Sequence, residues 1–591
     1  MTWGIRPTLP SARQMLGRVD FCGRGIYHLI RMSKLDLVLI HAPSNYDFRR
    51  RSIFYGPISD VIPPAPVFEM YPIGFVSLGA YLERHGIRSR VVNIASRMLR
   101  SARFDVEEFI AKLRARVFGI DLHWLPHAHG SLELARIVKR RHPDSKVVFG
   151  GLSATYFCEE LIQYPQVDFV IRGDSAEVPL LELLTRLKKG LPIGEVPNLS
   201  WKDDAGVPHH NPLSWVPSSL DDFPLDYDYP TRLVIRHRDI LSILPFRNWL
   251  SYPITMALTC RGCTLDCLTC GGSAYAFRNF YCRDKPAYRS PQRLVQDIRG
   301  VQKYLKGPVF IIGDIRQPGE EYAEELLGQL RAQGVKVPLV LELFSPAGKE
   351  FFDQVRKAVP QFNIQFSIES PDEEVRQAFG KGYSNREVEN TVEEALKAGC
   401  KRFDLFFMIG LPKQDFHSAV ETATYCRQLL RELDPERRLH PQISPLAPFL
   451  DPGSQAFEEP EKFGYQRLLH SLEEHRQALL EPSWKCMLNY QTRWLSRDEL
   501  VAATYETALK FNELKLEHGL LSSRTARSVE SRIRESLRLV NQVDQMAGGG
   551  KGLTQLGKLG RSTICEKKEL EWPALPLWLN LSGILRALFS R

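Results

Sequence analysis

Strand-length apolar runs alternate with helical patterns over two stretches of this chain, and this alternation restricts the fold more than any other feature. The first stretch extends from Leu35 to about Lys189, and the second extends from Ile254 to about Pro452. Nearly continuous apolar strands indicate parallel sheets that helices cover on both faces. The sequence therefore predicts an α/β fold in two successive domains, with ligands at the carboxyl ends of the strands.

The two stretches differ in the number of strands that they predict. The first is expected to form strands at Leu35–Ile40, Val91–Ile94, Val117–Ile120, Lys146–Phe149 and Val167–Ile171. The second is expected to form strands at Ile254–Leu258, Val309–Ile312, Leu339–Leu343, Asn363–Ile368, Arg402–Ile409 and Gln442–Leu446. Six strands with intervening helices are typical of a partial α/β barrel.

These patterns divide the chain into six segments. They are an N-terminal extension (1–33), an α/β domain (34–190), a proline-broken linker (191–250), the barrel domain (251–453), a mostly helical domain (454–545) and a flexible segment with an amphipathic tail (546–591). Five arginines and one acid in the extension favour a dispensable segment or a misassigned start over a transit peptide. The capping box Ser496–Glu499 opens one helix of the helical domain.

Composition excludes several classes of protein. Hydrophobic residues make up 43% and charged residues 25%, and the net charge of +9 is small for 591 residues, so nucleic-acid binding is not predicted. No apolar run reaches the roughly 20 residues that span a bilayer. Eleven cysteines are too dilute for a secreted disulfide framework and fit a reducing, cytoplasmic compartment.

Four of these cysteines fall between Cys260 and Cys270, directly after the first strand of the second domain. Thiolates are soft ligands that select iron–sulfur clusters or zinc. Cys263, Cys267 and Cys270 could hold a four-iron cluster with one iron left open, whereas all four cysteines could form a structural zinc site. The remaining cysteines are interpreted as buried or incidental: Cys22, Cys158, Cys282, Cys400, Cys426, Cys486 and Cys565.

The Cys-x3-Cys-x2-Cys spacing at the start of an α/β barrel resembles the radical S-adenosylmethionine (SAM) superfamily. Further resemblance lies in Phe310–Asp314, Phe366–Ser370, Lys381-Gly382, Phe406–Pro412 and Gln442–Gly453. The resemblance implies a [4Fe-4S] cluster on the three cysteines. It also implies SAM contacts at Gly313, Asp314, Ser367, Glu369 and Gly410.

The chain departs from this family's pattern in two places within the cysteine loop. The residue before the third cysteine is usually aromatic and packs on adenine, but here it is Thr269, so Tyr275 or Phe277 is expected to take that place. Cys260 is an additional thiol whose role the pattern leaves open.

An α/β domain ahead of such a barrel resembles the cobalamin-binding domain of the B12-dependent radical SAM class. The matching segments are Tyr71–Gly74, Phe149–Ser153 and Arg172–Glu177. The resemblance implies cobalamin contacts at Asp121, Gly150, Gly151, Ser153, Gly173, Asp174 and Glu177.

Two groups of histidines bear on this expectation. The loop after the first strand lacks the Asp-x-His-x-x-Gly that supplies a lower cobalt ligand elsewhere, and Asp121-Leu-His123 follows the wrong strand, so no histidine is expected below cobalt. His123, His127 and His129 are interpreted as a solvated loop rather than a metal site.

The resemblance implies an enzyme that cleaves SAM reductively to a 5′-deoxyadenosyl radical and transfers a methyl group from cobalamin to an unactivated carbon. It implies a flavodoxin- or ferredoxin-type electron donor and a small-molecule or lipid substrate. Three alternatives stay open: a non-methylating cyclisation or rearrangement, a radical SAM enzyme without cobalamin, and a non-catalytic binding module. The apolar tail Leu577–Phe589 is expected to dock on the protein itself, with peripheral membrane contact as the alternative.

Overall fold

The computed structural model describes residues 34–51, 53–54, 56–59, 67–445 and 450–546, together with residues 564–565, 569, 571–572 and 580. The expected N-terminal extension lies outside the described residues, and so does the amphipathic tail except for Asn580. Within the described part of the chain, no helix combines the length and the apolar character needed to cross a membrane.

The first domain is built on a seven-stranded sheet in the order β2-β1-β3-β4-β5-β6-β7. The first five strands of this order run parallel: β1 (Leu35–His41), β2 (Ser89–Asn93), β3 (Ala115–Asp121), β4 (Lys146–Gly150) and β5 (Phe169–Ile171). The helices between them are α1 (Gly74–Arg84), α2 (Ile94–Arg100), α3 (Val106–Lys112), α4 (Ala128–Arg141), α5 (Leu152–Tyr156), α6 (Cys158–Leu161) and α7 (Glu177–Lys189). This arrangement confirms the predicted parallel α/β domain.

Apolar residues on both faces of the first sheet give it two cores. Val38 and Ile40 of β1 belong to the core under α3 and α4, whereas Leu37 and Leu39 belong to the core under α1 and α7. Side chains of a strand point alternately to opposite faces, so a continuous apolar run fills both cores at once.

The segment 191–250 differs from the expected linker. It forms β6 (Leu199–Lys202) and β7 (Pro208–His210), an antiparallel pair that extends the first sheet beyond β5. It also forms α8 (Asp228–His237), which packs on α1 and hydrogen-bonds through Tyr229 to Ser89. The short strands escaped prediction because the prolines around them mask any alternation of apolar residues.

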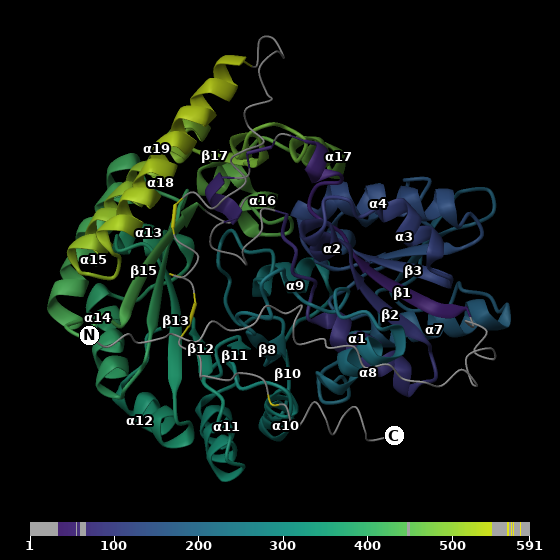
Figure 1. The fold of residues 1–591 in the computed structure, drawn as a ribbon, viewed down its shortest axis with the longest axis horizontal. Coiled ribbons are helices and arrows are strands. Elements are labelled where there is room, and N and C mark those ends of the chain that lie inside the picture. The colour runs from purple at the N-terminus through teal and green to yellow at the C-terminus, as the bar shows by residue number, and fades with distance from the viewer. Residues whose placement is uncertain are drawn as a thin grey trace, which may run out of the picture.

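The second domain is a six-stranded parallel sheet in the order β15-β14-β13-β12-β11-β8. Its strands are β8 (Thr255–Leu258), β11 (Val309–Ile312), β12 (Leu339–Leu343), β13 (Phe362–Glu369), β14 (Phe403–Ile409) and β15 (Leu439–Pro445). Its helices are α9 (Ala274–Phe280), α10 (Pro291–Gln302), α11 (Glu320–Ala332), α12 (Lys349–Ala358), α13 (Glu373–Phe379), α14 (Asn385–Lys397) and α15 (Phe416–Leu433). The outer strands β8 and β15 are not neighbours in the sheet, which confirms a partial barrel (Figure 1).

The C-terminal region contacts both preceding domains. It contains α16 (Gln455–Glu458), β16 (Tyr465–Arg467), α17 (Leu472–Ala478), β17 (Tyr490–Thr492), α18 (Arg497–Glu517) and α19 (Ser523–Met546). The predicted capping box at Ser496 opens α18, which packs on α15 of the barrel, while α17 packs on α4 of the first domain. Figure 1 shows α18 and α19 on the outer side of the barrel and α17 beside α4 at the edge of the first domain.

Described residues near the end of the chain form hydrogen bonds with the barrel. The indole Nε1 of Trp572 donates to the Asp404 carboxylate over 2.7 Å, and the Arg402 guanidinium donates to the Glu571 carbonyl over 3.1 Å. The Asn580 backbone N–H donates to the Tyr304 carbonyl after α10. The described part of the last segment is therefore anchored on the barrel, where a flexible segment was expected.

Candidate functional site

The three predicted cluster cysteines lie on the loop that follows β8 and the short strand β9 (Cys260–Arg261), which pairs with β10 (Ala287–Tyr288). Two of their sulfurs accept backbone N–H groups: Cys263 Sγ from Leu265 over 3.4 Å, and Cys270 Sγ from Gly272 over 3.3 Å. The Gln317 side-chain amide donates to Cys263 Sγ over 3.3 Å. N–H groups aimed at sulfur are a means by which proteins tune iron–sulfur clusters.

Cys260 has different partners from the other three. Its Sγ lies 3.4 Å from the Gly262 carbonyl, so this thiol is placed as a hydrogen-bond donor within its own loop. No group of three cysteine sulfurs lies within 4.8 Å of one another among the described residues. A hydrogen bond within its own loop sets Cys260 apart from Cys263 and Cys270, whose sulfurs accept backbone N–H groups.

Burial favours the protonated thiol at Cys260, Cys267 and Cys270. It raises the pKa of the Cys260 and Cys267 thiols to about 11 and the pKa of Cys270 well above its usual value. The Lys381 ammonium opposes this shift at Cys267. Metal binding at this loop therefore releases protons from the cysteines.

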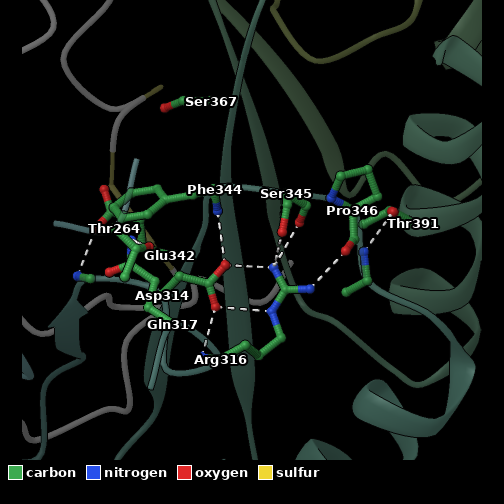
Figure 2. A network of polar contacts seen from close by, with 12 residues as sticks. Thr264, Asp314, Arg316, Gln317, Glu342, Phe344, Ser345, Pro346, Ser367 and Thr391 are labelled. Atoms are coloured by element: carbon green, nitrogen blue, oxygen red, sulfur yellow. Dashed lines mark hydrogen bonds and ion pairs between the residues drawn. The ribbon is translucent and has the colours of Figure 1, made fainter. Parts of the chain in front are cut away.

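The predicted SAM contacts lie at one edge of the sheet: Gly313 and Asp314 follow β11, Ser367 and Glu369 lie in the last residues of β13, and Gly410 follows β14. Asp314, directly after β11, is buried and its carboxylate is held by the Arg316 guanidinium and by the backbone N–H of Phe344 (3.0 Å) (Figure 2). Arg316 also donates to the Ser345 and Pro346 carbonyls over 2.7 Å. The Asp314 carboxylate thus fixes this loop, and the Gly313 backbone beside it is held by the Glu342 carboxylate over 2.8 Å.

Glu369 ends β13 with a buried carboxylate. One oxygen, Oε1, lies 2.6 Å from Lys381 Nζ, which also contacts the Ser367 carbonyl. The other oxygen, Oε2, is buried without a hydrogen-bond partner among the described residues. Burial alone would lower the pKa of Lys381, but the Glu369 carboxylate outweighs burial and raises it. An unpartnered carboxylate oxygen in this position fits a donor group of a bound ligand.

Glu342 on β12 was missed in the sequence analysis. Its side chain is half-buried at the edge where Gly313 and Asp314 lie, and desolvation together with the nearby Asp314 charge raises its pKa to about 7. A single acid within the apolar run Leu339–Leu343 was the signal that could have identified it. Acids of shifted pKa in a cleft are candidates for a functional role.

Gly410 follows β14 with a backbone φ of 100°. A Cβ at this position would lie 2.4 Å from the Tyr490 hydroxyl, and the Gly410 carbonyl accepts a bond from the Tyr465 hydroxyl over 3.0 Å. The glycine is therefore required by contact with the C-terminal region. Its contact with SAM stays a prediction.

The aromatic residues proposed near adenine lie in α9. Phe277 is buried and packs on Tyr281 with ring centroids 5.4 Å apart, whereas Tyr275 is half-buried. Thr269 is buried, and its carbonyl accepts the Asp451 backbone N–H over 3.3 Å. Their contact with adenine stays a prediction.

A cavity of about 260 Å³ lies at the carboxyl ends of β1, β3, β4 and β5 and extends to the barrel residues Leu258 and Arg261. Its wall includes six of the predicted cobalamin residues: Asp121, Gly150, Gly151, Gly173, Asp174 and Glu177. Ser153 lies in α5 and does not line this cavity. Apolar side chains of the sheet and of the helices α1 and α7 line the inner part of this cavity. A mainly apolar wall with a few polar groups suits a large, partly apolar ligand.

Gly151 shows how closely this wall is built. It has φ of 119°, and a Cβ here would lie 2.5 Å from the His123 Cα atom. Backbone therefore meets backbone beneath the cavity, which only glycine permits.

Two ion pairs join the cysteine loop to the rim of this cavity. Arg261, which follows Cys260, donates to the Glu177 carboxylate over 2.5 and 3.0 Å and to the Ser175 hydroxyl over 2.8 Å. Arg283 contacts both oxygens of the Asp174 carboxylate, and the Arg283 and Asp174 side chains are only 2% and 5% exposed. Asp174 and Glu177 are thus held by the barrel domain while they line the cavity.

A histidine group lies on the other side of the cavity. The Asp121 carboxylate accepts Nδ1 of His41 over 3.1 Å and Nδ1 of His123 over 2.6 Å, and these contacts hold its pKa far below the usual range against the effect of burial. His127 is buried beside His41. The expectation of a solvated histidine loop is therefore wrong, because the first strand and the helix α4 enclose it.

A second cavity of about 430 Å³ adjoins the first. Pro72, Ile73 and His123 line both cavities. The remaining wall of the second cavity is mainly apolar, with Trp249, Met256 and Leu305 among its residues. The structure thus places an apolar chamber beside the predicted cofactor site.

Residues 65–182 match the B12 binding domain, and residues 258–426 match the radical SAM superfamily. The hopanoid C-3 methylase of Methylococcus capsulatus is 25% identical over 320 residues, which are 53% of this chain and 56% of that protein. The chain thus matches little more than half the length of this relative.

Two solved structures resemble the fold. The radical SAM methyltransferase TsrM from Kitasatospora setae, with cobalamin and a [4Fe-4S] cluster bound, has a TM-score of 0.58 at 15% identity over 87% of this chain and 100% of that chain. The cobalamin-dependent SAM radical enzyme OxsB with aqua-cobalamin bound has a TM-score of 0.53 at 12% identity, over 95% of this chain and 81% of that chain. The chain therefore carries a segment that matches the B12 binding domain ahead of a segment that matches the radical SAM superfamily.

Proposed function

We propose that this protein is a cobalamin-dependent radical SAM methyltransferase that methylates an unactivated carbon of an apolar substrate. One observation carries the proposal: the ion pairs Arg261–Glu177 and Arg283–Asp174 hold the cysteine loop against the rim of the cavity lined by Gly150 and Gly151. The proposed sites for the cluster and for the corrin would therefore meet at one interface. The chemistry supplied by the bound cofactors is one-electron cleavage of SAM at the cluster and donation of a methyl group from cobalamin.

The protein residues have positioning roles in this reaction. Cys263, Cys267 and Cys270 hold the cluster. Glu369, fixed by Lys381 through Oε1, presents its unpartnered Oε2 to a donor group of SAM. The buried surroundings exclude water from the site, which protects reactive species.

An apolar substrate is supported by two observations. The cavity of about 430 Å³ beside the cofactor cavity has a mainly apolar wall, and it shares Pro72, Ile73 and His123 with that cavity. The curated relative is named a hopanoid C-3 methylase. We propose a lipid of comparable apolar character as the substrate, and a flavodoxin- or ferredoxin-type protein as the electron donor.

The test begins with anaerobic reconstitution of the full chain. We expect about four iron atoms per chain and formation of 5′-deoxyadenosine from SAM under reducing conditions. Cys267→Ala should abolish both, whereas Cys260→Ala, the matched control, should retain both because Cys260 is bonded within its own loop. Full SAM cleavage by Cys267→Ala would contradict the cluster assignment.

Methyl transfer is tested separately with SAM that carries a deuterated methyl group. Lipid extracts incubated with the holoenzyme should contain a product heavier by one labelled methyl group. Formation of 5′-deoxyadenosine from SAM without any labelled product in these extracts would instead support the non-methylating alternative. If protein purified with added cobalamin shows no corrinoid absorption band, cobalamin is removed from the proposal.

A further inference from the structure

Three histidines form a ligand group outside the cysteine loop, at the carboxyl ends of β1 and β3. One ring nitrogen from each of His41, His123 and His127 lies within 4.8 Å of those of the other two. His41 ends β1, and His127 directly precedes α4. The sheet thus brings together residues that are more than 80 positions apart in the chain.

The outer contacts of these histidines resemble those around protein-bound metals. A metal-ligating histidine usually donates its second ring N–H to a carboxylate or a backbone carbonyl. Here Nδ1 of His41 and Nδ1 of His123 both contact the Asp121 carboxylate, and Nδ1 of His127 contacts the Ala42 carbonyl over 3.1 Å. All three Nδ1 atoms have a partner, so a metal bound through the Nε2 atoms would leave each of these contacts in place.

Two of the three histidines are buried, and the third lines the cavities. His41 and His127 are 0% and 1% exposed, whereas His123 lines both cavities. Nε2 of His41 lies 3.0 Å from the Phe68 carbonyl, a contact that it would exchange for the metal. A bound ion would therefore be enclosed by buried protein at His41 and His127 and would face the cavities at His123.

We propose that His41, His123 and His127 bind a divalent transition metal of the zinc type, with Asp121 as the orienting carboxylate. Imidazole nitrogens suit zinc, and three histidines with an open fourth position form a known type of zinc coordination. The ion would join β1, the loop after β3 and the start of α4, and it would fix His123 between the two cavities. This site is separate from the cysteine cluster and does not depend on the proposed methyl transfer.

The experiment uses the full chain with its iron–sulfur cluster reconstituted, so that the cysteines are occupied. Zn²⁺ is added, weakly bound metal is removed by dialysis, and zinc and iron are measured in the same sample. We expect one zinc per chain in the wild type, its loss in His127→Gln, and at least a tenfold weaker affinity in Asp121→Asn. His129→Gln is the matched control, because His129 is bonded to the Tyr46 backbone outside this group and should leave zinc unchanged.

X-ray absorption at the zinc edge gives an independent readout on the wild type, which holds even if a variant fails to fold. We expect imidazole nitrogens at about 2.0–2.1 Å from zinc. Sulfur at about 2.3 Å, or zinc retained by His127→Gln, would overturn the proposal. Absence of bound zinc in the wild type would overturn the proposal as well. This outcome includes the case in which the spectrum of a bound Co(II) corrinoid shows a nitrogen ligand that is lost in His123→Gln. Failure of methyl transfer alone would leave these results unaffected.

Discussion

The buried pair Arg283–Asp174 makes a sharp stability prediction, because it connects the cysteine loop to the first domain. Asp174→Asn keeps the shape of the side chain but leaves the Arg283 guanidinium without its counter-charge. Arg283 is 2% exposed, and its remaining polar contacts are the Pro217 carbonyl over 2.9 Å and the introduced amide oxygen. Removing one partner of a buried pair costs about 3–5 kcal/mol, and we expect the lower figure because these neutral acceptors remain.

The measurement is urea unfolding of the full chain, followed by far-ultraviolet circular dichroism. With a slope of about 3 kcal/mol per molar urea, a loss of about 3 kcal/mol lowers the unfolding midpoint by about 1 M. The matched control is Glu108→Gln, which breaks the exposed pair Lys112–Glu108, whose side chains are 71% and 64% exposed. Exposed pairs contribute about 0–1 kcal/mol, so this midpoint should move by about 0.3 M or less.

The reasoning is refuted if Asp174→Asn moves the midpoint no further than Glu108→Gln does. A second variant separates the loss of the pair from an isolated buried charge. Arg283→Met combined with Asp174→Leu removes both charges, and such replacements are often neutral or stabilising. The double variant should therefore unfold at a higher urea concentration than Asp174→Asn.

Two further predictions concern the barrel. Glu342 holds its proton in the folded protein up to its raised pKa of about 7, so wild-type stability should fall as pH rises from the ordinary value of 4.5 to about 7, by up to about 3 kcal/mol in total. Glu342→Gln should remove this slope in urea midpoints measured from pH 4.5 to 8, and an unchanged slope would assign it to other groups. Gly410→Ala should lower stability by about 2 kcal/mol or more, because its Cβ would meet the Tyr490 hydroxyl at 2.4 Å and its φ is 100°. Gly300→Ala in α10, with open space around its Cβ, is the control and should unfold at the same urea concentration or a higher one; equal midpoints for both variants would contradict the packing argument.

Much of the fold could be predicted because local patterns carry it. Strands such as β3 and β14 are mainly apolar runs, and the capping box at Ser496 indicates the start of helix α18. The antiparallel pair β6–β7 was missed, since its few residues lie among prolines and have no apolar periodicity. Short strands of this kind are determined by the sheet edge on which they pair.

The candidate site was predictable in its residues but less so in its contacts. Spacing alone pointed to Cys263, Cys267 and Cys270, but no local pattern relates Arg261 to Glu177 or Arg283 to Asp174. Those pairs join residues about 85 to 110 positions apart, and only the packing of two domains decides them. His41 was likewise unrelated to His127 until the sheet placed them together.

The wall shared by the two cavities has a thermodynamic consequence. Pro72, Ile73 and His123 face both spaces, so a ligand that shifts these residues in one cavity alters the free energy of binding in the other. Such linkage is reciprocal: if an occupied cofactor cavity tightens substrate binding by some factor, the substrate tightens cofactor binding by the same factor. The order in which the protein fills its two cavities would then be set by concentrations, while the stability of the fully loaded state would be the same by either route.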